Sequence, residues 1–118
     1  MRARVFGLFT IAVILLAVPS VCRAQMTVNH YRGLSDGERA FYVVGLIDGW
    51  RHAVEVLKGL KESETTVKFF GAIVECTGPM TRRQVLTIVD DYVRANPDEW
   101  NRSALSHAYL ALDGACAR

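Results

Sequence analysis

The chain has 118 residues, of which 51% are hydrophobic and 22% are charged, and its formal net charge is +2. We expect residues 1–24 to be removed on export, which leaves 94 residues with 11 basic and 12 acidic side chains and a net charge of −1. This balance favours neither nucleic acid nor an anionic membrane as a partner. The length suffices for one small domain but not for two.

The first 24 residues have the order of a secretory signal peptide: a basic start with Arg2 and Arg4, an apolar run over residues 11–18, and small residues before a cleavage site after Ala24. The apolar run is shorter than the roughly 20 residues that a membrane-spanning helix needs, which disfavours the alternative of a retained anchor. Cys22 is expected to leave with the signal peptide. The sequence therefore predicts a mature protein in the periplasm, free of the membrane.

Two cysteines, Cys76 and Cys116, remain in the mature chain. An even pair in an exported protein is more typical of a disulfide than of a metal site or a catalytic nucleophile. Because the two residues are 40 positions apart, the chain-entropy model assigns such a bond about 4 kcal/mol of stability. That value is comparable to the net stability of a small domain.

Residues 25–34 have no sustained hydrophobic period, and we predict a flexible lead-in. Ser35 and Glu38 then have the spacing of a capping box, which predicts a helix that begins there and runs to about Leu60 with apolar residues at steps of three and four. Gly45 and Gly49 lie four apart in this helix, and we expect them to allow close approach of another helix. The polar residues 58–64 predict a turn.

The apolar run over residues 65–75 cannot be assigned to helix or strand by its period alone. Since helices are predicted on both sides of it, we expect a short helix or an irregular segment that leads to Cys76. Thr81 and Gln84 form a second capping-box pattern, and a helix with an apolar stripe follows until Asn96-Pro97 ends it.

The last helix is expected to bury Ala104, Leu105, Ala108, Leu112 and Ala115. The fold class predicted from these elements is all-α, a small disulfide-stapled bundle of about four helices within residues 35–118.

The sequence contains no candidate catalytic, cofactor-binding or metal-binding residue, and we do not expect an enzyme. His30, His52 and His107 lack metal-ligand spacing, and solvated or core-edge positions are expected for them. Asp90 and Asp91 are neighbours in a helix, so their side chains diverge; we expect them on its outer side.

The aromatic residues also bear on function. Phe41, Trp50, Tyr92 and Tyr109 fall in or beside apolar stripes, where core packing is the expected role. Trp100 lies in a polar segment between two helices, and its side chain either folds back onto the core or serves as an anchor for a partner.

Several short patterns occur in a recognisable order. The first pattern begins at the aromatic Phe41 and contains Gly-x-x-x-Gly. Cys-x-x-Pro then starts at Cys76, and Thr-x-x-Gln starts at Thr81. Tyr-Val-x-x-Asn-Pro starts at Tyr92, and Ala-Leu precedes the final cysteine. Over residues 41–116 the chain resembles the Rap/Tai family of type VI secretion immunity proteins. The resemblance implies a small all-helical periplasmic protein, a Cys76–Cys116 pairing, Gln84 as a structural helix-start residue and Pro97 as the break before the last helix.

The resemblance also implies a function: binding and inhibition of a peptidoglycan amidase effector, by a protein that acts as a homodimer. The segment with most freedom to protrude toward a partner is residues 96–102, with Trp100 as the anchor and Asp98, Glu99 and Arg102 as a charged rim. An HdeA-like periplasmic acid-stress chaperone and an orphan structural cell-envelope domain are the alternatives. A neighbouring gene for an amidase would distinguish the first function from the other two.

Overall fold

A computed structural model describes residues 25–60 and 64–117 of the chain. Its elements are α2 (Val28–Arg32), α3 (Asp36–Leu57), α4 (Glu64–Thr77), α5 (Arg82–Ala95), the short 3-10 helix η2 (Pro97–Glu99) and α6 (Ala104–Cys116). The described part of the chain contains no β-strand beyond one isolated bridge between Thr27 and Ser103. The predicted all-α class is confirmed, whereas the predicted signal peptide lies outside the described residues.

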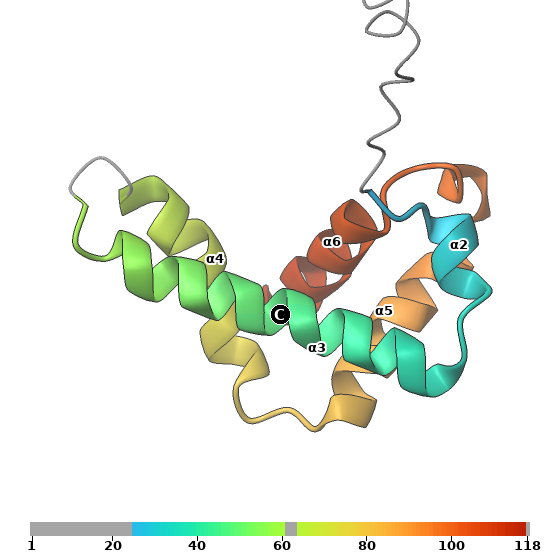
Figure 1. Ribbon diagram of the computed structural model, residues 1–118, viewed down its shortest axis with the longest axis horizontal. Coiled ribbons are helices and arrows are strands. Elements are labelled where there is room, and N and C mark those ends of the chain that lie inside the picture. The colour runs from blue at the N-terminus through green and yellow to red at the C-terminus, as the bar shows by residue number, and fades with distance from the viewer. Residues whose placement is uncertain (1–24, 61–63, 118) are drawn as a thin grey trace, which may run out of the picture.

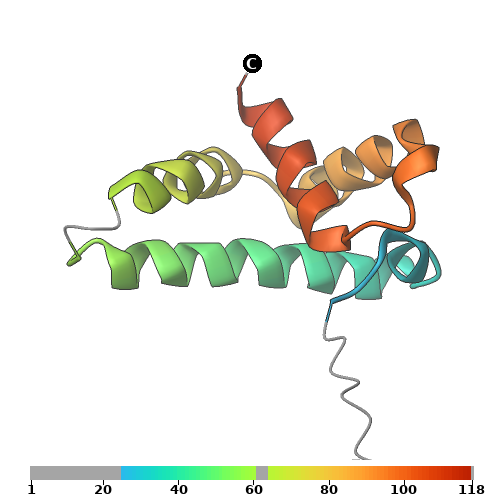
Figure 2. The same ribbon diagram turned by 90° about the horizontal axis from the view of Figure 1, so that it is seen from above.

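Helix α3 is the longest helix, and α4 and α5 pack along it. Figure 2 shows it as a straight rod, with α4 along its C-terminal half, α5 along its N-terminal half and α6 crossing between the two. Helix α6 also contacts both α4 and α5. The molecule is thus a bundle in which the long α3 packs against α4 and α5, and α6 packs against these two shorter helices.

Both predicted capping boxes are present and set the starts of α3 and α5. The backbone N–H of Ser35 donates to the Glu38 carboxylate at 2.8 Å, and the N–H of Glu38 donates to the Ser35 hydroxyl at 3.4 Å. Thr81 and Gln84 exchange the equivalent bonds at 2.7 and 3.2 Å. Each box supplies acceptors to N–H groups that have no partner within the helix, so the helices begin where the sequence predicts.

The core lies where the predicted stripes meet. Each of the helices α3 to α6 contributes buried residues at helical spacing, which agrees with the expected burial of an amphipathic face. The principal buried residues are Val43, Ile47, Trp50 and Val54 of α3, Ile73 of α4, Val85, Val89 and Val93 of α5, and Ala104, Ala108 and Leu112 of α6.

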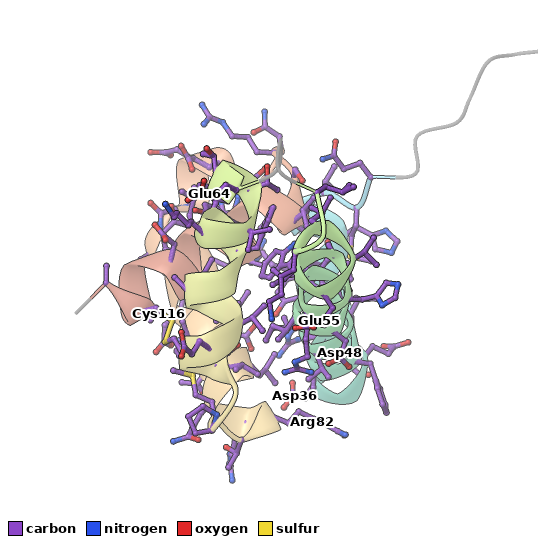
Figure 3. All side chains as sticks on the ribbon, turned by 90° about the vertical axis from the view of Figure 1, so that its left-hand side faces the viewer. Asp36, Asp48, Glu55, Glu64, Arg82 and Cys116 are labelled. Carbon is purple, nitrogen blue, oxygen red and sulfur yellow. A yellow bond between two sulfur atoms is a disulfide. The ribbon has the colours of Figure 1, made fainter. Side chains whose placement is uncertain are left out.

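The disulfide predicted from the sequence is formed. Cys76 lies in the last turn of α4 and Cys116 at the end of α6, with 2.01 Å between the sulfur atoms and 5.9 Å between the Cα atoms. Figure 3 shows the bond in yellow beside the end of α4. Residues 65–75 are helical, so of the two structures expected there the short helix is correct.

The prediction of a flexible lead-in over residues 25–34 is wrong. Helix α2 occupies residues 28–32, with Val28 and Tyr31 buried in the core. The backbone N–H groups of Val28 and Asn29 donate to the carbonyl groups of Arg102 and Trp100 at 2.9 and 2.8 Å. Contacts with a segment about 70 residues away in the sequence therefore order this helix, and a local period could not reveal them.

Three expectations about packing are also wrong. Gly45 and Gly49 are exposed, and a Cβ atom at either position would meet nothing within 4 Å, so no helix approaches them closely. Phe41 is 67% exposed rather than in the core, with the Arg82 guanidinium 5.0 Å from its ring. Leu105 lies on the outer side of α6 and is 37% exposed.

Candidate functional site

The segment predicted to meet a partner, residues 96–102, is a structured turn between α5 and α6. Asn96 donates from its side-chain amide to the Tyr92 carbonyl at 2.7 Å, and Pro97 then begins η2. Proline fits this first position because its missing N–H would have no helical partner there. Asp98 and Arg102 are exposed, whereas Glu99 and Trp100 are partly buried. The structure thus brings the four predicted residues together but turns two of them inward.

Trp100 folds back onto the core and does not protrude. Its indole Nε1–H donates to the Val93 carbonyl at 2.8 Å, and the guanidinium of Arg32 lies 3.2 Å from its ring centroid. Of the two roles that the sequence left open for Trp100, packing onto the core is the one observed. The indole fixes the segment on α5, and the cation–π contact fixes it on α2.

Glu99 is turned toward α6. Its carboxylate lies 3.1 Å from the Arg102 guanidinium and 3.5 Å from Nε2 of His107. His107 is fully buried, with its Nδ1 atom 3.2 Å from the Ser103 carbonyl oxygen and its ring edge-on to Tyr92. The expectation of a solvated or core-edge position for His107 is therefore wrong, although His30 and His52 are exposed as predicted.

Beside this segment is a pocket of about 350 Å³, called here the arginine pocket. Figure 1 shows its setting at one end of α3, where α2, α5 and η2 come together. Its charged and aromatic lining consists of Tyr31, Arg32, Arg39, Asp90, Arg94 and Trp100.

Asp90 is the centre of a hydrogen-bonded network in the arginine pocket. Its carboxylate accepts from the Tyr31 hydroxyl at 2.8 Å and from the Arg39 guanidinium at 3.2 Å, and the guanidinium also donates to the Leu34 carbonyl at 2.7 Å. The side chains of Asp90 and Arg39 are only 21% and 19% exposed. The network joins α2, α3 and α5 through side chains that the sequence separates by more than 50 residues.

The electrostatics of the network keep Tyr31 protonated. Burial raises the pKa of Tyr31 far above its usual value, and the hydrogen bond to Asp90 and the charge of Asp90 raise it further. Burial alone would lower the pKa of Arg39, but the neighbouring Asp90 and Asp36 carboxylates outweigh it and the pKa is raised. The phenol is thus a permanent donor and the guanidinium a permanent cation.

Asp90 was expected on the outer side of α5 together with Asp91, and that prediction is wrong for Asp90. Asp91 is exposed and pairs with Arg94 at 3.1 Å. Asp90 follows the buried Val89 and precedes the buried Val93 by three residues, so it lies at the edge of the apolar stripe. That position was the signal available in the sequence, although it did not identify Tyr31 and Arg39 as partners.

A second surface is apolar and lies over α3, α4 and α6. It is a groove of about 370 Å³, called here the aromatic groove, lined chiefly by Trp50, Phe69, Phe70, Leu105, Tyr109 and Leu110. The rings of Phe69 and Tyr109 stack with their centroids 4.6 Å apart. Phe69 is nevertheless 50% exposed and Leu110 44% exposed, so part of this apolar cluster is open to solvent.

The described residues include no group of three or more His, Cys, Asp or Glu side chains that could hold a metal ion. None of the described helices combines the length and apolarity needed to cross a membrane. Both cysteines of the described part form the disulfide.

No protein-family model, curated protein or solved structure matches the chain.

Proposed function

We propose that this chain is a periplasmic immunity protein that binds and inhibits a type VI secretion peptidoglycan amidase, as its resemblance to the Rap/Tai family implies. The observation that carries the proposal is the Cys76–Cys116 disulfide, because it joins the two positions that the resemblance pairs, at the ends of two helices. A disulfide also suits the oxidising periplasm.

The ordered conformation of residues 96–102 supports this function. An inhibitor needs a surface that is already ordered, because ordering a loop on binding costs affinity. The segment meets that need through the Trp100 indole bond to α5 and the backbone bonds to α2. Asp98 and Arg102 remain exposed on it and are the side chains most available to a partner. Trp100 contributes by holding the segment, which changes the anchor role first expected for it.

Calorimetry against purified type VI peptidoglycan amidases tests the proposal, starting with one encoded beside this gene if it exists. The double variant Asp98→Ala/Arg102→Ala removes one acidic and one basic side chain from the proposed surface. Asp48→Ala/Arg51→Ala is the matched control, because this exposed pair lies on α3 and its loss leaves the net charge unchanged.

We expect the wild type to bind tightly. The affinity of the first variant should be at least ten-fold lower, equivalent to about 1.4 kcal/mol, and the affinity of the control should change little. Equal affinities of both variants would refute the surface assignment alone. Absence of binding to every amidase tested would refute the function and return the protein to the two alternatives. Suppression of client aggregation at low pH would then identify an HdeA-like chaperone, and its absence a structural domain.

The proposal includes a homodimer, with the aromatic groove as the surface that a second copy covers. Homodimer interfaces are more apolar than transient ones, which matches this groove better than the charged segment at residues 96–102. Phe69→Glu should therefore yield a monomer in sedimentation equilibrium. Phe41→Glu, at an even more exposed phenylalanine on α3, is the control and should leave the dimer intact. A monomeric wild type would refute this part of the proposal.

A further inference from the structure

The arginine pocket carries more positive charge than its own carboxylate balances. Arg32, Arg39 and Arg94 line it, and Asp90 is the single acidic residue in its lining. Asp36 and Asp91 also pair with Arg39 and Arg94, but both of these carboxylates are largely exposed. Exposed ion pairs contribute little and exchange readily. An entering anion therefore meets Arg39 in the wall of the pocket and the exposed Arg32 and Arg94 at its rim.

Arg32 is the cation with most capacity to bind. Among the described residues no acidic side chain pairs with it, and its guanidinium carbon lies 3.2 Å from the centroid of the Trp100 ring. The ring is itself held by its bond to the Val93 carbonyl. A guanidinium held this close to the ring has lost part of its motion before a ligand arrives, so binding costs it less entropy.

Arg39 adds an unused donor. Its Nε atom is buried and has no hydrogen-bond partner, whereas its terminal nitrogens bind Leu34, Asp36 and Asp90. A buried donor without an acceptor lowers the stability of the fold. A carboxylate displacing Asp36 across the Nε and Nη2 edge of this guanidinium would satisfy it, in the side-on bidentate arrangement that arginine favours.

The negative charge of Asp90 limits the charge of the anion that the pocket can bind. It accepts from Tyr31 and Arg39 and remains in the floor of the pocket, where it would repel a dianion such as phosphate more strongly than a singly charged group. The chain without residues 1–24 is close to neutral, which gives no general attraction for nucleic acid. The Trp100 ring beside the pocket offers apolar surface for the methylene groups of a side chain.

We propose that the arginine pocket binds the carboxylate of a glutamate side chain that projects from the partner protein, held by Arg32 and Arg39. This proposal rests on the proposed function only for the identity of the partner. The pocket itself can be tested without one, so the two proposals can fail separately.

The probe is the peptide acetyl-Gly-Glu-Gly-amide, with acetyl-Gly-Gln-Gly-amide as the uncharged isostere and sodium acetate as the free carboxylate. NMR follows the Trp100 indole N–H and the Arg39 Nε–H, which report on the two walls of the pocket. We expect both resonances to shift saturably with the Glu peptide at millimolar concentration and the affinity to fall as salt is added. The Gln peptide should bind at least about ten-fold more weakly, and acetate more weakly than the Glu peptide.

Variants then test the residues. Arg32→Gln should weaken binding of the Glu peptide by about five-fold or more. Arg94→Gln, at an exposed side chain of the pocket rim, is the second variant and should weaken binding by a smaller factor. Arg83→Gln removes an exposed arginine that lines a different hollow and should leave the affinity unchanged. Equal binding of the Glu and Gln peptides, equal binding of acetate and the Glu peptide, no saturable shift, or indifference to both pocket variants would each overturn the proposal.

Discussion

Replacing Cys76 and Cys116 by alanine should cost this domain a large share of its stability. The bond spans 40 residues, for which the chain-entropy model gives about 4 kcal/mol. With an unfolding entropy of about 2.1 cal/mol/K for each of the 94 residues after the predicted cleavage site, the loss corresponds to a fall in Tm of about 20 °C. Helix α4 should be affected first, because only Ile73 and Thr77 of its 14 residues are buried.

Thermal unfolding followed by far-UV circular dichroism measures this effect. The wild type under reducing conditions should reproduce the double variant, and reductant should leave the double variant unchanged, which controls for side effects of the reagent. Hydrogen exchange should show that α4 amides lose protection before those of α5. A fall in Tm of less than about 5 °C, or unaltered exchange in α4, would refute the view that the bond holds α4 on the bundle.

Three further predictions concern single residues. Asp90→Ala leaves the Tyr31 hydroxyl and the Arg39 guanidinium without their shared acceptor, and urea unfolding should show a loss of about 2–3 kcal/mol; no loss would contradict the network. Gly45→Ala and Gly49→Ala should each raise the free energy of unfolding by up to about 1 kcal/mol, since both positions are helical and open, whereas a loss would reveal an undetected close contact. Hydrogen bonds from Ser35 lower the pKa of Glu38 in the folded protein. The Glu38 carboxylate therefore stabilises the fold at any pH above the pKa that Glu38 has in the unfolded chain, and this stabilisation is lost as the pH falls through the pKa of Glu38 in the folded protein. Glu38→Gln should flatten stability against pH in that acidic range, and an unchanged profile would exclude this contribution.

The features predicted correctly are those that neighbouring residues determine. The capping boxes at Ser35 and Thr81 act over three residues, and the apolar stripes repeat within a single helix. The prediction of the disulfide rests on the expected compartment and on the pair of cysteines that remains after the predicted cleavage, which needs no knowledge of the fold. These local rules were enough for the helix order and for most of the core.

The features missed depend on contacts between distant parts of the chain. Five residues are too few to show a hydrophobic period, so the sequence does not predict α2. The helix depends on hydrogen bonds from its N–H groups to the carbonyls of Trp100 and Arg102. Phe41 and Leu105 fall at the edges of their stripes, where the crossing of the neighbouring helix decides burial. Periodicity identifies a face of a helix but not how much of that face a neighbour covers.

The candidate site was predicted only in part. Residues 96–102 were identified correctly as the segment between the last two helices, but the inward turn of Trp100 depends on the Val93 carbonyl and on Arg32. The arginine pocket itself combines side chains from α2, α3 and α5, including a pair 51 residues apart. No motif relates such residues in the sequence, so the pocket could be recognised only in three dimensions.

Inhibition of amidase activity tests the central claim most directly. Residues 25–118, with the disulfide formed, would be titrated into a purified type VI peptidoglycan amidase during hydrolysis of peptidoglycan. We predict that hydrolysis stops near equimolar protein, that the Asp98→Ala/Arg102→Ala variant requires at least about ten-fold more, and that Asp48→Ala/Arg51→Ala behaves as the wild type. Hydrolysis that continues unchanged in a large excess of the wild-type protein, for each amidase tested, would contradict the account.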